Sequence, residues 1–346
     1  MLSLVIGVLA GLARLAVDVP AIASAQAGTH GALMIAAFLG TVISLERAVA
    51  LGRGWPYGAP LGAGLGGLSL LLNLPIELSQ FFFVSAGMLL TWGSILILRQ
   101  QPALYTATLA LGALSWLVGC ATWAATGMIV PAVPWWMAFL ILTIAGERLE
   151  LTRFLPTPRI AKRVFVWITA LQLLALIGTF WQADVGLRVF GASLFALALW
   201  LLRQDIARHT VRQSGLTRFI AICLLSGYAW LACGGLLGMA GGLMTGSPLR
   251  DAALHAIFLG FIFSMIFGHA PIIFPAVANV RIPYHPVFYL PLLALHGSLV
   301  ARLGGDLLEL PALRQSAGIG NAVALLIFLL TMLSSVARGW RGRQPN

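Results

Sequence analysis

Four histidines lie inside long apolar stretches of this 346-residue sequence: His30, His255, His269 and His296. Moving an imidazole out of water into a membrane is unfavourable, so such residues usually bind a metal or haem iron, carry protons or hydrogen-bond to a buried partner. Other ionisable groups are scarce, since only 9% of the residues are charged. These histidines are therefore the first candidates for chemistry.

The composition predicts a membrane protein. Hydrophobic residues make up 60% of the sequence and the mean hydropathy is +0.96, which is more apolar surface than a soluble protein can cover. At ~20 residues for each span, the chain accommodates about twelve transmembrane helices and no separate soluble domain. We therefore predict an all-α polytopic bundle in the lipid bilayer, with residues 1–346 forming a single transmembrane domain.

Hydropathy, interrupted at proline, glycine and charge clusters, predicts where these twelve helices lie. The predicted spans are residues 2–22, 27–51, 57–75, 77–98, 104–128, 133–152, 163–183, 186–203, 217–243, 251–276, 286–303 and 315–337. Two series of glycines with four-residue spacing predict close packing of the third and ninth spans against neighbouring helices. These series are Gly58, Gly62, Gly66 and Gly234, Gly238, Gly242.

The basic residues predict the orientation. Most of the 21 Lys and Arg residues lie near the ends of even-numbered spans or at the C-terminus, and the exceptions are Arg14, Arg188, Arg250, Arg302 and Arg314. The positive-inside rule then places both termini in the cytoplasm, and we expect a bacterial inner membrane. This bias accounts for the net charge of +11, so nucleic acid is not an expected partner.

A Glu-Arg pair ends both the second and the sixth spans, at the same interval after a Phe-Leu dipeptide. The pairs are Glu46–Arg47 and Glu147–Arg148. The tenth span shares Phe-Leu-Gly with the second but carries no such pair. A repeat every four spans predicts three four-helix units about a pseudo-threefold axis. The Glu-Arg pairs are interpreted as ion pairs at helix ends or, if buried, as a proton path.

The histidines of the second and tenth spans are predicted to share one depth. His30 and His255 each lie about one turn into spans that run inward, which places both in the outer leaflet. Two histidines on different helices at one depth could hold opposite faces of a haem or share a metal. His296, near the outer end of the eleventh span, could join them as a metal ligand or be a hydrogen-bonded packing residue.

His269 is expected to act separately. It lies roughly 21 Å along the helix from His255, too far for the two side chains to ligate one metal. Pro271 and Pro275 follow it, and we expect the inner end of the tenth span to break or kink there. A broken helix beside a histidine suits a proton or ion path, or is a plain helix end.

This pattern of spans and histidines resembles subunit I of the haem-copper oxidases and nitric oxide reductases. It also resembles the smaller NnrS family, which is similar to them and is associated with haem, copper and nitric oxide stress. The resemblance implies a haem held by His30 and by His255 or, as an alternative, His269, and copper as a further metal. The sixth and seventh spans lack the histidines that hold copper in the oxidases, so oxygen reduction at a binuclear centre is not expected.

Three functions follow from this sequence, and whether the protein is an enzyme stays open. The first is a haem-binding, and also copper-binding, membrane protein in electron transfer or the nitric oxide response, acting with a redox partner or a larger membrane complex. The second is a transporter or permease that uses the proline-interrupted tenth span and the Glu-Arg pairs. The third is a structural partner in a membrane complex. An absorption spectrum with metal analysis separates the first from the others.

Overall fold

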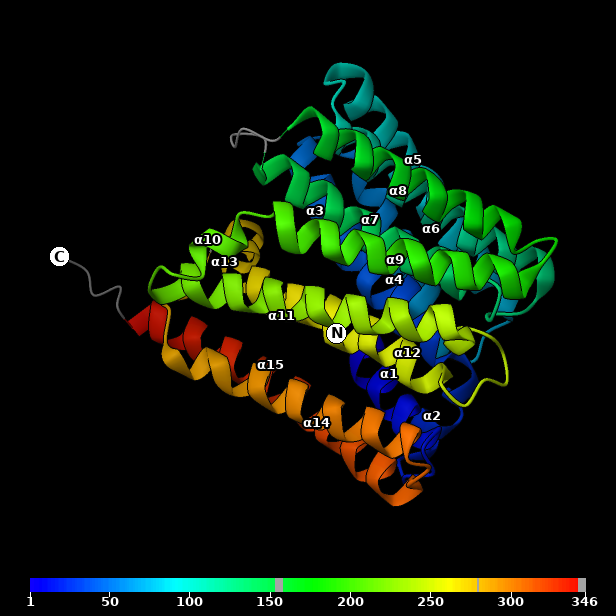
Figure 1. Cartoon of the computed structure of the whole chain (residues 1–346). Coiled ribbons are helices and arrows are strands. Elements are labelled where there is room, and N and C mark those ends of the chain that lie inside the picture. The colour runs from blue at the N-terminus through cyan, green and yellow to red at the C-terminus, as the bar shows by residue number, and fades with distance from the viewer. Residues whose placement is uncertain (153–157, 279, 342–346) are drawn as a thin grey trace. The chain divides into compact units, whose positions relative to one another are not determined.

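The computed structural model describes residues 1–152, 158–278 and 280–341 (Figure 1). Helices account for 84% of the described residues, and no strand occurs in these three ranges, which confirms the predicted all-α fold. The chain divides into two compact units, Met1–Leu151 (unit 1) and Thr152–Asn346 (unit 2). The single transmembrane domain stays a prediction.

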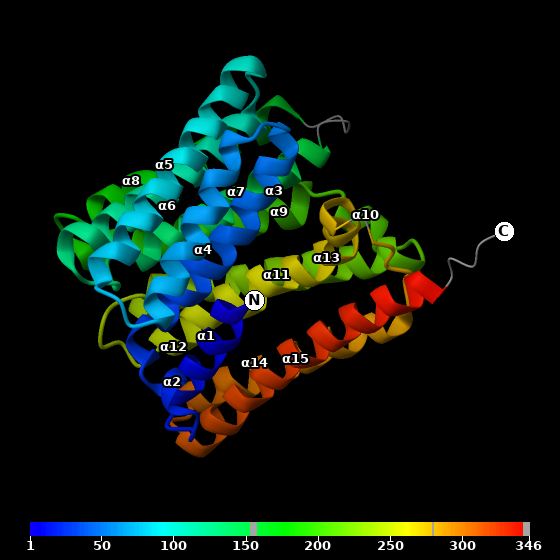
Figure 2. The ribbon, with the colours of Figure 1, turned by 180° about the vertical axis from the view of Figure 1, so that it is seen from behind.

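Unit 1 is built from long helices joined by short ones. In chain order these are α1 (Leu2–Ala13), α2 (Ala21–Ser24), η1 (Ala27–Thr29), η2 (Ala32–Leu39), α3 (Gly40–Leu51), η3 (Trp55–Tyr57), α4 (Gly58–Leu71), α5 (Ile76–Gln100), α6 (Leu104–Thr126) and α7 (Val133–Thr152). Helices α4, α5 and α6 pack as successive neighbours, and both views of the ribbon show them side by side (Figures 1 and 2).

Unit 2 contains the remaining helices. They are α8 (Arg159–Gly178), α9 (Ala183–Gln204), α10 (Ala207–Thr210), α11 (Gly215–Leu237), η4 (Gly238–Gly242), α12 (Arg250–His255), η5 (Ala256–Phe263), α13 (Ser264–Ala278), η6 (Pro286–Phe288), α14 (Tyr289–Leu307) and α15 (Pro311–Arg341). Helices α12, η5 and α13 follow one another without interruption. Helices α14 and α15 lie side by side along most of their length (Figures 1 and 2).

Nine helices in the described residues are long and apolar enough to cross a membrane. Helix is present at each of the twelve predicted positions, but α1, α4 and α7 are not among these nine. The 12 residues of α1 and the 14 of α4 rise about 18 and 21 Å, less than a hydrocarbon core of ~30 Å. Helix α7 is long enough but carries three charged side chains in its last turns.

The first predicted span is wrong in its extent. Helix α1 ends at Ala13 and helix resumes only at Ala21, eight residues later. Between them Ala16 has a φ of +58°, a left-handed conformation that an L-residue cannot continue as α-helix. Pro20 then caps the next short helix. The apolar stretch is therefore divided by backbone geometry that hydropathy does not report.

A break of the tenth span at its two prolines is also wrong, whereas a kink there, the other predicted alternative, stays a prediction. Helix α13 continues from Ser264 to Ala278 through both Pro271 and Pro275. Proline is tolerated in a membrane helix when neighbouring helices hold it in place. Here the ring of Phe267 stacks on Phe328 of α15, with ring centroids 4.0 Å apart. This packing supports the helix at the turn that precedes Pro271.

Glycines allow close contact between neighbouring helices, as the sequence predicts. An added Cβ at Gly62 of α4 would lie 3.2 Å from the Cβ of Ala86 and 3.2 Å from the carbonyl oxygen of Phe82, both in α5. Gly238 similarly faces α9, where an added Cβ would lie 3.1 Å from the Cα of Gly191. Small residues at such positions let helix backbones approach in a membrane.

Candidate functional site

His30 lies in unit 1 between η1 and η2. Its half-buried ring places Nδ1 2.6 Å from the carbonyl oxygen of Gly7 in α1. The ring also packs against Gly11, one turn further along α1, where an added Cβ would lie only 2.7 Å from the ring atom Cε1. Two glycines of α1 therefore position this imidazole, one through its carbonyl group and the other by lacking a side chain.

His255 is the last residue of α12 in unit 2, directly before η5. Its Nδ1 lies 2.8 Å from the backbone carbonyl oxygen of Asp251 and 3.3 Å from Oδ1 of the Asp251 carboxylate. The His255 side chain is 20% exposed. A residue one turn earlier on the same helix thus holds His255 from one side.

These contacts determine which ring nitrogen carries the proton in each neutral histidine. A carbonyl oxygen can only accept, so Nδ1 donates in both His30 and His255. A neutral ring protonated on Nδ1 has its lone pair on Nε2. Metal-ligating histidines almost always have this arrangement, because the hydrogen bond fixes the tautomer and the orientation of the ring.

Each of these two histidines is followed by a π-helix. The eight-residue helix η2 begins two residues after His30, and the eight-residue helix η5 begins one residue after His255. π-Helices are rare, appear mostly as single turns and are frequent at functional sites. Two different units thus each present an anchored histidine at the beginning of a π-helix. The common depth of the two histidines stays a prediction.

His269 lies in α13, after η5. Its Nδ1 is 2.7 Å from the carbonyl oxygen of Met265, one turn earlier, so this ring also donates from Nδ1. The same tautomer therefore occurs at His269 as at His255. Its position differs, because it follows the π-helix by more than one turn.

His296 of α14 uses both of its ring nitrogens within unit 2. The indole Nε1 of Trp230 in α11 donates to His296 Nδ1 over 2.9 Å, and His296 Nε2 lies 3.1 Å from the hydroxyl of Ser226. The rings of His296 and Trp230 also stack, with centroids 6.1 Å apart. This arrangement favours the packing alternative for His296 over metal ligation.

The two Glu-Arg sequences come together in unit 1. Nη2 of Arg47 in α3 lies 2.6 Å from Oε1 of Glu147 in α7, and Glu46 interacts electrostatically with both residues. Arg148, next to Glu147, is only 4% exposed. The arginine of one sequence therefore pairs with the glutamate of the other, within a partly buried cluster of acidic and basic groups.

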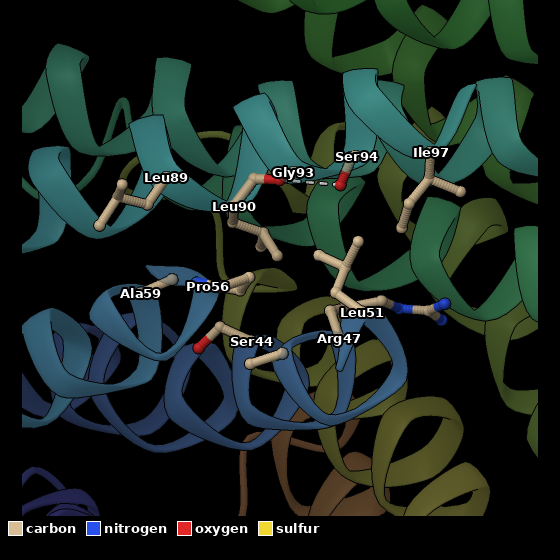
Figure 3. A pocket seen from close by; sticks show the side chains of 11 residues that line it. Ser44, Arg47, Leu51, Pro56, Ala59, Leu89, Leu90, Gly93, Ser94 and Ile97 are labelled. Carbon is tan, nitrogen blue, oxygen red and sulfur yellow. Dashed lines mark hydrogen bonds between the residues drawn. The ribbon is translucent and has the colours of Figure 1, made fainter. Parts of the chain in front are cut away.

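A pocket of about 240 Å³, counting the space open to solvent, lies beside this cluster (Figure 3). Side chains of α3 and η3 face those of α5 across it. The hydroxyls of Ser44 and Ser94 donate to carbonyl oxygens of their own helices, which leaves the guanidinium of Arg47 as the charged group of the lining. The lining of this small pocket is therefore largely apolar, with one charged side chain.

A polar network surrounds Asp251 in unit 2. Arg302 of α14 contacts the Asp251 carboxylate with two atoms, Nε at 2.8 Å and Nη2 at 3.0 Å. Nη1 of Arg302 lies 3.4 Å from Oδ1 of Asn321 in α15, whose amide donates to the hydroxyl of Ser298 over 2.7 Å. Arg302 and Asn321 are buried. The network therefore connects α12, α14 and α15.

Asp251 and Arg302 were not among the residues that the sequence singled out for chemistry. The four-residue spacing of Asp251 and His255 could have indicated that they are in contact, because side chains at that spacing on a helix are neighbours. The contact with Arg302 had no such signal, since 51 residues separate it from Asp251.

A site of several clustered protein ligands is not found in the described ranges, where no three His, Cys, Asp or Glu side chains are arranged to hold a metal ion. Axial ligation of haem iron needs a single side chain on each face of the ring and does not depend on such a cluster. No curated protein and no solved structure matches this sequence. The chain belongs to the family described as Domain of unknown function (DUF8744), which matches residues 1–337.

Proposed function

We propose that this protein is a haem-binding integral membrane protein similar to the NnrS family and to haem-copper oxidase subunit I. The observation that carries the proposal is the shared setting of His30 and His255. Each half-buried ring donates from Nδ1 to a backbone carbonyl, and each precedes an eight-residue π-helix. The proposed role is electron transfer or the response to nitric oxide.

The chemistry of the donor set fits a haem. His30 and His255 would hold it through Nε2, the ring atom that carries the lone pair in both. A bound haem would supply an iron centre that accepts and releases one electron or binds a small gas molecule. Gly7 and Gly11 orient the ring of His30, and Asp251 orients the ring of His255.

Other predicted ligands have weaker support. His269 shares the tautomer of His255 and is kept as the alternative ligand in the tenth span. Copper binding at His296 has less support, because hydrogen bonds engage both ring nitrogens. A redox partner or membrane complex is part of the proposal because one-electron chemistry needs a source and an acceptor of electrons.

The proposed architecture has twelve spans in three four-helix repeats about a pseudo-threefold axis. Helix at all twelve predicted positions supports it, with the short helices α1 and α4 crossing only part of the bilayer. The distribution of the basic residues supports cytoplasmic termini in a bacterial inner membrane. Reporter fusions at Gly127, which directly follows α6, and at Gln213, in the connection before α11, test this topology with opposite expected results.

The test of haem binding is the absorption spectrum of the full chain, purified in detergent from cells supplied with a haem precursor. We expect a Soret band that His30→Ala and His255→Ala each weaken or abolish, and that added imidazole partly restores. His209→Ala is the matched control, because His209 lies exposed on α10. Colourless, metal-free wild-type protein would overturn the proposal.

Transport is the second candidate, and one observation favours it. Glu46, Arg47 and Glu147 form a partly buried cluster, as expected of a path for a proton, and Arg47 of this cluster also lines the small pocket between α3 and α5 (Figure 3). The discriminating measurement is proton movement in vesicles that contain the purified protein. Haem-free protein whose proton flux is lost in Glu147→Gln would favour the transporter.

A further inference from the structure

Asp251 interacts with three charged or titratable side chains, which are His255, Arg302 and Asp306. One carboxylate oxygen, Oδ1, lies 3.3 Å from Nδ1 of His255 and also receives a hydrogen bond from Nη2 of Arg302. The other, Oδ2, accepts from Nε of Arg302 over 2.8 Å. Because the arginine occupies both oxygens in a two-point contact, the carboxylate cannot rotate freely. Its orientation toward the histidine is therefore fixed.

The rest of the network holds Arg302 in place. Its side chain is only 8% exposed, and Asn321 lies within 3.4 Å of its third nitrogen. Asn321 is in turn tied to Ser298, whose hydroxyl donates to the backbone of α14. A planar guanidinium with such contacts is preorganised for a carboxylate, which a flexible lysine would not be. Helices α14 and α15 thus determine the position of a side chain beside His255.

We propose that Asp251, held by Arg302, positions His255 as a haem ligand and makes its Nε2 a stronger electron donor. This inference rests on the proposed function. A carboxylate that accepts from Nδ1–H orients an imidazole and raises its basicity, and such partners are typical of ligating histidines. A more basic histidine ligand would stabilise oxidised iron and so lower the reduction potential of a bound haem. Asp251 and Arg302 are positioning residues and do not themselves touch the haem.

His30 and His255 would then be unequal ligands. Nδ1 of His30 lies against the neutral carbonyl of Gly7, whereas Nδ1 of His255 lies against a carbonyl and a carboxylate together. The carboxylate polarises its ring more strongly than a neutral acceptor can. Removing the carboxylate should therefore weaken the ligand in unit 2 and leave the ligand in unit 1 unaffected.

The sharpest test is the double variant Asp251→Asn with Arg302→Gln. A single exchange would leave one buried charge without its partner and could prevent folding, whereas the double exchange keeps the net charge of the pair at zero. A shift in reduction potential therefore cannot come from a changed net charge. The matched control is Asp184→Asn with Arg188→Gln, an exposed ion pair in α9 of the same unit.

We expect the double variant to raise the midpoint potential of the bound haem and to weaken haem affinity about 10- to 100-fold. The control variant should change neither quantity, and Asp251→Glu should recover part of the wild-type potential. A double variant with wild-type potential and affinity would overturn the inference while the proposed function stands. Wild-type protein that binds no haem would overturn both.

A second measurement does not need haem. In haem-free protein labelled with ¹⁵N-histidine, nuclear magnetic resonance reports which ring nitrogen of His255 is protonated, and comparison with His255→Ala assigns the signal. We expect the proton on Nδ1 in both proteins, because the backbone carbonyl of residue 251 remains in the double variant. The ¹⁵N chemical shifts of the His255 ring should differ between the two proteins, because the carboxylate beside Nδ1 is gone, and unchanged shifts would overturn the positioning role. A wild-type His255 protonated on Nε2 would overturn the positioning role even if haem binds elsewhere.

Discussion

Replacing Gly11 by alanine tests whether α1 positions the ring of His30. The added Cβ would lie 2.7 Å from Cε1 and 3.0 Å from Nδ1 of His30, closer than real Cβ contacts. The ring must therefore move away from α1. This movement would lengthen or break the hydrogen bond of 2.6 Å between Nδ1 of His30 and the carbonyl oxygen of Gly7.

The magnitude follows from three contributions. Glycine to alanine inside a helix is favourable by about 0.8–1.0 kcal/mol. Losing the Nδ1 hydrogen bond costs about 0.5–1.5 kcal/mol, so these two terms nearly cancel. Crowding a packed position costs roughly 1–3 kcal/mol, which we expect to remain as the net destabilisation of Gly11→Ala. Haem affinity should fall as well, because the displaced ring loses the contact that orients it.

The control is Gly64→Ala, in α4 of the same unit, where an added Cβ meets nothing within 4 Å. This variant gains helix propensity without a clash, so its unfolding temperature should rise slightly or stay unchanged. Thermal unfolding of both haem-free variants in the same detergent measures the difference, and a haem titration measures affinity. If Gly11→Ala is as stable as Gly64→Ala and binds haem as the wild type does, α1 does not position His30.

Three further predictions concern contacts within single units. Glu147→Gln should destabilise the protein by about 1–3 kcal/mol, because Arg47 loses its charged hydrogen-bond partner, whereas the exposed Glu77→Gln should change little; denaturant titration measures both. Gly235→Ala should cost about 1–3 kcal/mol, since the added Cβ would lie 2.6 Å from the backbone of α9, and an unchanged unfolding temperature would refute that helix contact. His296→Gln should lower stability by about 1–3 kcal/mol through its two hydrogen bonds, yet leave haem content unaltered, so loss of metal or haem would show that it is a ligand.

Much of the fold could be predicted from hydropathy and glycine spacing. Helices occur at all twelve predicted positions, because burial of apolar side chains in lipid depends on local composition. Their lengths could not be predicted in the same way. The left-handed φ of Ala16 ends the first helical segment within an apolar stretch, whereas Pro271 and Pro275 do not end α13. Both results depend on backbone conformation and on neighbouring helices.

The candidate site was predictable only in part. An apolar sequence makes each histidine conspicuous, but it does not distinguish His255, anchored through one nitrogen, from His296, engaged through both. That difference depends on Trp230 and Ser226, which come from another helix. Arg302 was visible only as a charge at the end of a span, and its contact with Asp251 joins α14 to α12 through packing.

The π-helices change how the internal repeat is understood. Sequence alignment of the second and tenth spans matches Phe38-Leu39-Gly40 with Phe258-Leu259-Gly260. In the structure Phe38 and Leu39 end η2 and Gly40 begins α3, whereas the second set lies near the middle of η5. Alignment by the starts of the two π-helices therefore displaces the two sets by four residues, about one turn. The match of the Phe-Leu-Gly sequences and the match of the π-helices therefore pair different residues of the two spans. Because π-helices depart from regular geometry beside His30 and His255, and such departures concentrate at functional positions, the backbone correspondence is the better guide to the site.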